Sequence, residues 1–373
     1  MKIAFYNVEN IFHRDAGLVQ PHVGRGVKMW MEELETYLTK DRRTDRDYER
    51  MRELSFLLGF ERVSYEPYVV MRRRWGGLYI RKRGHTMDYK ADSLTHWNGW
   101  IKVQTFPVGE QAIANKARVI REVNPDILLL QEVEDRTTVE DFNDLFFSQT
   151  EESIYHHFHV LCGHDYRGLE MGVMSNKKYP VHSVRSLNVL REGVGLFPQD
   201  FQHYTFQCSK KKTVHVLFAQ LQSPTGKQEW VTGRRKAQAH AMGKAYRKLR
   251  GQGEAHIIMA GTFYMPYYAD ALSPIFRDTD VKDISKHPTF QPTPDNGKDG
   301  SYFRLGAYRL GVNIRQEDFL LLSPELFDRV TASGLNRKGM WPKNRSQWET
   351  YDTVQNEQEA ASHHPLLWCD LDI

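Results

Sequence analysis

Short apolar runs of strand length recur along this 373-residue chain, and several of them end in polar residues. The clearest run is Ile257–Ala260, which Gly261 ends before a loop that reaches Pro266. The same pattern predicts strands at Ile3–Val8, Asp126–Val133, His157–Cys162, Glu170–Ser175, Val214–Leu221, Phe319–Leu322 and Pro365–Leu371. Polar groups at strand ends are where α/β proteins usually bind and transform their ligands. These runs therefore predict a sheet-based α/β fold.

Amphipathic helices are predicted between these strands. Glu110–Val123 has an apolar stripe and stops before Pro125, and Gly233–Arg250 carries alanines on one side. Met29–Leu38 and Asp45–Phe60 have the same spacing nearer the N-terminus. We expect one domain over residues 1–373, with a helical and hairpin insertion at about 25–106.

Composition excludes few classes of function. Fifty-one Lys and Arg against forty-seven Asp and Glu give a net charge of +4, which is no nucleic-acid signature by itself. The three cysteines are scattered, which predicts buried free thiols. Neither a signal peptide nor a membrane-spanning run is visible, so we expect a cytoplasmic protein. The oligomeric state stays open.

Two basic segments each permit two interpretations. β-Prone runs flank Trp75-Gly76-Gly77 and are rich in Arg from Arg72 to Arg83, which predicts a hairpin. The helix at Gly233–Arg250 holds seven Lys or Arg and no acid. Each segment could contact nucleic-acid phosphates, but charge runs are more often solvated faces.

Three predicted strand ends carry polar residues suited to metal binding or catalysis. Asn7, Glu132 and Gln220 each lie at the end of an apolar run. Strand ends gather at one edge of a sheet, so these side chains are expected to converge. An amide and a carboxylate form an oxygen-ligand set typical for Mg²⁺.

Read together, the strand-end phrases resemble the endonuclease/exonuclease/phosphatase superfamily, most closely a bacterial branch with an extended N-terminal region. The phrases are FYNVENIF, NPDILLLQEVED, DYRGLEMGVMSN, the strand before LQSPTG, DFLLLSPELF and AASHHPLLWCDLDI. The resemblance implies a DNase-I-like, four-layered α/β sandwich, with two packed mixed sheets flanked by helices. It also implies metal-dependent cleavage of phosphoesters.

The resemblance assigns roles to individual positions. Asn7 and Glu132 match the positions that hold Mg²⁺ or Mn²⁺ in such enzymes. Where the family has an Asn-His pair, a Gly-Asp-x-Asn phrase and a Ser-Asp-His phrase, this chain has Ala219-Gln220, Gly261–Tyr264 and Ser362–His364. The catalytic positions thus hold Ala219, Gln220, Thr262, Tyr264 and His363, and we expect His364 to have lost its carboxylate partner. The remaining candidate catalytic residues are His364, Asp165 and Asp318.

These departures predict a catalytically impaired pseudoenzyme that acts as a binding or regulatory module for nucleic acid or a protein, with a weak metal site or none. The alternative is an active metal-dependent nuclease or phosphodiesterase whose remodelled site binds a transition metal through imidazoles and carboxylates. The candidate nucleic-acid contacts are Arg167, Arg234, Arg235 and Lys236.

Overall fold

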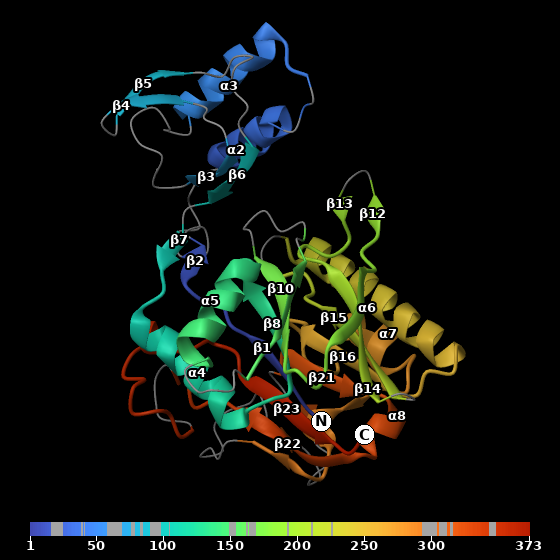
Figure 1. The fold of residues 1–373 in the computed structure, drawn as a ribbon. Helices are drawn as coiled ribbons and strands as arrows, with labels where there is room; N and C mark the ends of the chain where they lie inside the picture. Colours follow the sequence, from blue (N-terminus) through green and yellow to red (C-terminus); the bar gives the residue numbers. More distant parts are fainter. Residues whose placement is uncertain are drawn as a thin grey trace. The chain divides into compact units, whose positions relative to one another are not determined.

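A computed structural model of the chain describes most of its residues. These are residues 1–15, 25–38, 40, 42–57, 69–75, 79–82, 85–89, 98–103, 105–148, 154–161, 163, 169–191, 194–209, 212–224, 227–292, 304–305, 312–313, 316–342 and 348–373. The chain divides into two compact units (Figure 1). One unit comprises Met1–Phe12 and Val108–Ile373, and the other comprises His13–Pro107. The predicted insertion at about 25–106 lies within the second unit. That residues 1–373 form one domain with this insertion stays a prediction.

The first sheet of the larger unit has seven strands in the order β18-β22-β23-β1-β8-β10-β9. Their bounds are Phe290–Gln291, Val330–Asn336, Leu366–Leu371, Lys2–Asn7, Ile127–Val133, Glu170–Ser175 and His157–Leu161 in that order. β1 runs parallel to β8 and antiparallel to β23, so the sheet is mixed. The predicted strands at residues 3, 126, 157, 170 and 365 are all present in it.

The second sheet has six strands in the order β11-β14-β15-β16-β21-β17. Their bounds are Val181–Ser186, Phe201–Ser209, Lys212–Ala219, Ile257–Thr262, Asp318–Leu322 and Lys282–Asp283 in that order. β15 runs parallel to β16, and β16 runs antiparallel to β21. The sequence predicted β15, β16 and β21, but it did not predict β14 in this sheet or β22 in the first.

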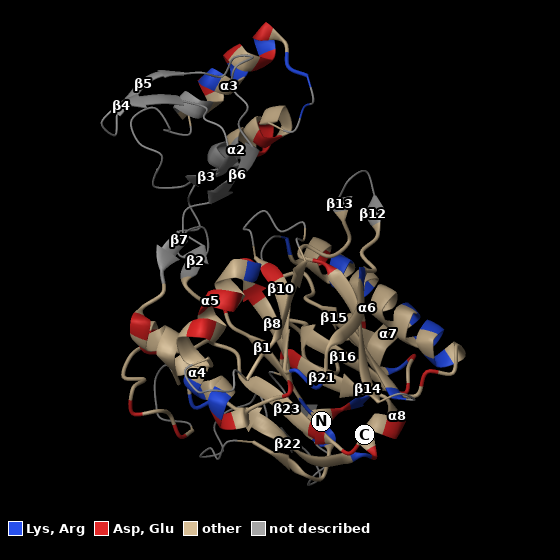
Figure 2. Ribbon diagram, in the orientation of Figure 1, with Lys and Arg blue, Asp and Glu red and all other residues tan. Residues whose placement is uncertain are grey.

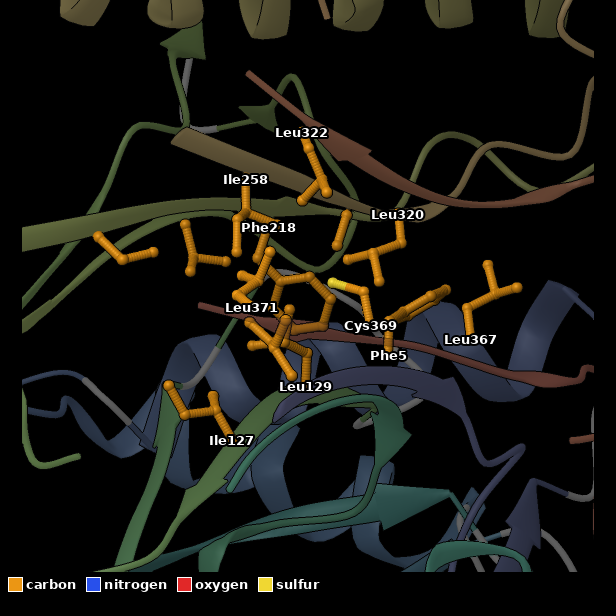
Figure 3. Close-up of a cluster of buried hydrophobic side chains, with 14 of the residues drawn as sticks. Phe5, Ile127, Leu129, Phe218, Ile258, Leu320, Leu322, Leu367, Cys369 and Leu371 are labelled. Carbon is orange, nitrogen blue, oxygen red and sulfur yellow. The ribbon is translucent and has the colours of Figure 1, made fainter. Parts of the chain in front are cut away.

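The two sheets pack face to face around one apolar core (Figure 3). Alternate residues of each strand point into it, among them Phe5, Leu129, Phe218, Ile258 and Leu320. Their neighbours along the strand point to the opposite face, because side chains alternate with a period of two. Burial of each such side chain contributes about 1.5–3 kcal/mol to the free energy of folding. Continuous apolar runs are required because both faces of these central strands are covered.

Helices cover the two outer faces. α4 (Glu110–Val123) and α5 (Arg136–Phe146) pack against the first sheet through a second apolar cluster, which includes Tyr6, Leu128 and Ile120. α6 (Gln228–Gly251) and α7 (Ser273–Phe276) pack against the second sheet through a third cluster. The order helix–sheet–sheet–helix confirms the predicted four-layered sandwich.

In its described residues, the smaller unit contains two helices and three strand pairs. The helices are α2 (Arg25–Leu38) and α3 (Asp45–Leu57), close to their predicted bounds. β3 (Val69–Trp75) pairs with β6 (Asn98–Val103), β4 (Tyr79–Lys82) with β5 (His85–Tyr89), and β2 (His13–Asp15) with β7 (Thr105–Pro107). The predicted hairpin of residues 69–75 with 79–82 is therefore wrong as a pairing. A glycine pair permits a tight turn, but it does not select the partner of a strand.

The remaining elements are short. They are β12 (Leu190–Arg191), β13 (Val194–Gly195), β19 (Arg304–Leu305), β20 (Val312–Asn313), α8 (Pro324–Phe327) and the 3₁₀ turns Asp270–Leu272, Ile284–Lys286 and Glu357–Glu359. Cys369 is a buried free thiol and Cys208 a half-buried one, whereas Cys162 lies outside the described residues. Among the described helices, none is both long enough and apolar enough to cross a membrane.

Candidate active site

The predicted strand ends meet where the two sheets face each other. Asn7 ends β1 beside Gln131 of β8, and Thr262 ends β16 beside Asp318 of β21. Gly261 has a φ of 152°, and a Cβ on it would lie 1.8 Å from the carbonyl oxygen of the neighbouring β15. Only glycine therefore lets β16 end in this position.

Backbone strain is concentrated at these strand ends. Among the described residues, five that are not glycine have positive φ, and four of them belong to this region. These four are Glu9, Asn10, Glu132 and Tyr264. Such conformations cost about 1–3 kcal/mol each and occur mostly where a site requires them.

The carboxylate of Glu132 is the centre of the site and is 5% exposed. Its Oε1 accepts hydrogen bonds from Asn7 Nδ2 at 3.3 Å, Gln220 Nε2 at 2.6 Å and Tyr264 Oη at 3.1 Å. Gln220 and Tyr264 also contact each other. The amide oxygen of Gln220 is buried and accepts no hydrogen bond from the described residues. One carboxylate oxygen thus takes three protein donors.

Thr262 joins this group to a second carboxylate. Its hydroxyl is fully buried, donates to Asp318 Oδ1 at 2.7 Å and accepts from Asn7 Nδ2 at 3.2 Å. The backbone N–H of Thr262 donates to Gln131 Oε1 at 3.0 Å. The hydroxyl proton and one lone pair are therefore committed within the protein.

Asp318 is the carboxylate partner of His364, so the expectation that this imidazole had lost its acid is wrong. His364 Nδ1 lies 2.8 Å and 3.0 Å from the two oxygens of Asp318. The two residues are 46 positions apart. Asp318 begins β21 of the second sheet and His364 lies just before β23 of the first, so the packing of the two sheets brings them together. A sequence motif contains only neighbouring residues, so the motif around His364 did not reveal an acid that lies 46 positions away.

Burial of His364 opposes its positive charge, but nearby carboxylates outweigh that effect. The charge and hydrogen bond of Asp318, with the charges of Glu9 and Glu132, raise the pKa of His364 to about 10. The side chain is 12% exposed. At neutral pH this site therefore contains an imidazolium.

Glu9 is a site residue that the sequence reasoning did not single out. Its Oε2 accepts from His363 N at 2.8 Å, His363 Nδ1 at 2.8 Å and Ser362 Oγ at 3.3 Å. Burial raises the pKa of Glu9, but the bonds and charges of His363 and His364 hold it far below its ordinary value. The hydrogen bond and charge of Glu9 raise the pKa of His363. The only feature of the sequence that could have indicated Glu9 is its position two residues after Asn7, which ends a strand.

The three consecutive basic residues of α6 have different environments. Arg235 is 5% exposed and donates to the backbone carbonyls of Gln222 at 2.6 Å and Tyr264 at 3.1 Å. Its predicted contact with nucleic acid is therefore wrong, since the guanidinium holds the Tyr264 loop from inside. Arg234 is half-buried and donates to Gly195 O at 2.6 Å, and Lys236 is exposed.

Three other predictions concern residues without a described polar role. Ala219 is buried among apolar side chains between the second sheet and α6. Asp165, a candidate catalytic residue, and Arg167, a candidate nucleic-acid contact, lie outside the described residues. Of the predicted metal ligands, Asn7 and Glu132 lie together in the structure. Of the predicted catalytic residues, His364 and Asp318 lie together.

The donor set does not fit a divalent cation between Asn7 and Glu132. The Asn7 amide oxygen accepts the backbone N–H of Glu9 at 3.1 Å, which turns the amide nitrogen toward Glu132. A cation there would face N–H and O–H donors, whereas Mg²⁺ requires oxygen acceptors. Among the described residues, no group of three or more His, Cys, Asp or Glu is arranged to hold a metal. The imidazoles that could have bound a transition metal form hydrogen bonds to carboxylates, His363 to Glu9 and His364 to Asp318.

Comparison with known proteins gives matches among solved structures. No family model and no curated protein matches the chain. Truncated TDP2 of Caenorhabditis elegans is 18% identical with a TM-score of 0.44, over 70% of this chain and 91% of that one. The human nocturnin catalytic domain is 14% identical with a TM-score of 0.47, over 70% and 86%. Because these TM-scores are below 0.5, the two similarities do not assign a function to this chain.

A further similar structure comes from Bacteroides vulgatus. It is 16% identical with a TM-score of 0.47, over 69% of this chain and 90% of that one. Its name describes it as an endonuclease/exonuclease/phosphatase, which is the family that the sequence motifs of this chain resemble.

Proposed function

We propose that the chain is a catalytically impaired relative of the endonuclease/exonuclease/phosphatase enzymes that serves as a binding or regulatory module. The observation that supports this most directly is the closed hydrogen-bond network around Glu132. Three donors occupy one oxygen of its carboxylate, and Thr262 bridges Asn7 to Asp318. Most polar groups of the described site hydrogen-bond one another, the amide oxygen of Gln220 excepted.

The missing groups have a calculable cost. Thr262 cannot accept a proton near neutral pH, so general-base assistance worth roughly 10²–10⁴ in rate is absent. Ala219 supplies no donor to the site, and its side chain lies in the apolar layer between the second sheet and α6.

The same site retains features of a binding pocket. The imidazolium of His364 supplies a positive charge beside the strand ends. The buried amide oxygen of Gln220 has no partner among the described residues, which leaves an acceptor for a donor on a ligand. The Gln220 oxygen therefore suits a ligand that carries an N–H or O–H group, whereas Asp318, Glu9 and Glu132 offset the positive charge of His364.

One observation favours a second function, phosphoester hydrolysis in a remodelled site. The Asp318–His364 pair is intact at 2.8 Å, and an imidazolium can stabilise developing charge or protonate a leaving group. This function would need a water-activating group that the described part of the site does not supply.

Hydrolysis assays separate the two functions. Purified protein is incubated with plasmid, single-stranded DNA, RNA and a small phosphodiester in the presence of Mg²⁺, Mn²⁺ or Zn²⁺. We expect the wild-type protein to turn over these substrates no faster than Glu132→Ala does. Glu110→Ala, at an exposed position outside the site, is the control variant. Robust turnover that disappears in both Glu132→Ala and His364→Ala would establish the hydrolase and refute the proposal.

A further inference from the structure

The outer face of α6 combines exposed cations with an exposed tryptophan. α6 packs its apolar side onto the second sheet through residues such as Met242 and Tyr246. The opposite side is exposed. Beyond the first two residues of the helix, its exposed charged or aromatic side chains are Trp230, Lys236, His240, Lys244, Arg247 and Lys248. We refer to these six residues as the outer face of α6. No Asp or Glu occurs between Trp230 and Gly251.

Within the described part of the chain, the cations of the outer face of α6 form no ion pair with an acid. Among the ion pairs of the described residues, those of α6 involve only Arg250, at the edge of the helix. Arg247 donates to a backbone carbonyl, that of Asp278, at 3.3 Å. Figure 2 shows Lys and Arg along this helix. The helix thus carries a row of like charges.

Two other surface helices each pair an arginine with an acid one turn away. Arg118 of α4 lies 3.7 Å from Glu122, and Arg136 of α5 lies 2.8 Å from Glu140. Both pairs have the i,i+4 spacing that stabilises a solvated helix, whereas like charges at this spacing destabilise it. A helix that only faced water would gain stability from interspersed acids, so the row on α6 needs another explanation.

The spacing of the row fits a nucleic-acid strand. Lys236 and Lys248 are twelve residues apart, which at 1.5 Å per residue is about 18 Å along the helix. That length corresponds to about five stacked nucleotides at a rise of 3.4 Å per strand. The long lysine side chains can therefore reach successive phosphates of one strand.

Trp230 indicates which form of nucleic acid fits. The ring is 53% exposed, and the guanidinium of Arg234 lies 5.4 Å from its centroid. A Cβ on Gly233, one turn along the helix, would meet nothing within 4 Å, so open space adjoins this part of the helix. Bases stack on exposed aromatic rings only when they are unpaired. The ring therefore favours a single strand over a duplex.

We propose that the outer face of α6 binds single-stranded nucleic acid, with phosphates on Lys236, Lys244 and Lys248 and a base stacked on Trp230. The inference narrows the partner of the proposed binding module, and it stands whether or not the strand-end site hydrolyses anything.

Binding is measured by fluorescence anisotropy with a labelled oligothymidylate and with a duplex, in EDTA so that no metal-dependent cleavage interferes. The test variant is the triple Lys236→Glu, Lys244→Glu, Lys248→Glu. The matched control is the triple Lys177→Glu, Arg277→Glu, Arg329→Glu, which makes the same charge change at exposed positions of the same unit. Circular dichroism verifies that both variants are folded.

We expect the wild-type protein to bind the single strand more tightly than the duplex. The test variant should bind the single strand more weakly but still measurably at low salt, and its logarithmic salt dependence should become less steep by about 2, since each single-strand phosphate contact contributes about 0.7. Trp230→Ala should weaken binding about 5- to 150-fold without changing the salt dependence. Equal weakening by the test and control variants, no measurable binding by the wild type, or equal affinity for duplex would overturn the proposal.

Discussion

The Asp318–His364 pair should make the stability of the protein depend on alkaline pH, and Asp318→Asn should remove that dependence. In the folded protein the pKa of His364 is about 10, against an ordinary value of 6.5. The folded state therefore binds a proton more tightly than the unfolded chain. The resulting stabilisation is complete below about pH 6.5 and is lost as the pH rises toward 10.

The structure sets the size of the effect. A difference of 3.5 between 10 and 6.5, at about 1.36 kcal/mol per unit, gives at most about 5 kcal/mol. The charged groups that act on His364 are Asp318, Glu9, Glu132 and Glu317, with His363 opposing them. Asp318 is the largest of the stabilising contributors, so its neutralisation should remove most of the dependence.

The assay is urea unfolding at a series of pH values between about 6.5 and 10. The free energy of unfolding of the wild type should fall across this range, and that of Asp318→Asn should start about 3–5 kcal/mol lower and fall less. Lysines and tyrosines also titrate near pH 10, so the difference between the two proteins is the quantity to compare. Asp352→Asn, at an exposed acid that pairs with Arg118, is the control, because an arginine stays charged across this pH range.

A constant difference between wild type and Asp318→Asn across the range would refute this reasoning. It would mean that His364 is neutral in the folded protein and that the pair is an ordinary hydrogen bond. A control variant that behaves like Asp318→Asn would likewise show that the effect is not local.

Three further predictions concern the strand-end site. His363→Asp replaces a donor to Glu9 with a carboxylate, so Mn²⁺ should raise its melting temperature while leaving the wild type and His363→Asn unchanged; a Mn²⁺ shift of the wild type would contradict the fit argued above. Tyr264→Phe removes one of three donors to Glu132 and should cost about 0.5–1.5 kcal/mol, and this cost should vanish in a Glu132→Ala background, which has no acceptor, if the contact carries it. Gly261→Ala places a Cβ 1.8 Å from a carbonyl oxygen and should abolish cooperative unfolding, whereas Gly233→Ala should be tolerated; a folded Gly261→Ala protein would disprove the close approach.

Much of the fold could be predicted from local patterns. Runs such as Ile257–Ala260 are apolar on both faces, and that is possible only for strands covered on both sides. The strand-end positions of Asn7 and Glu132 followed from the same runs, because residues that end neighbouring parallel strands share an edge. α5, β14 and β22 were not predicted.

The partners within the site could not be predicted this way. Asp318 and His364 are 46 residues apart, Glu9 and His363 are 354 apart, and Gln220 and Glu132 are 88 apart. The pattern of a sequence assigns a residue to a face or an edge, but a hydrogen bond depends on distances of a fraction of an ångström.

Arg235 illustrates the same limit on the charged surface. A run of basic residues predicts a basic helix, yet the helical rotation of each residue determines whether it faces water or the core. Lys236 is exposed, and its neighbour Arg235 is turned inward to the carbonyls of Gln222 and Tyr264. Local patterns thus established many of the strands and the strand ends of this protein, and the expectation of four layers came from the resemblance to a known family. The donors around its carboxylates depend on how distant segments pack, because only packing sets their separation.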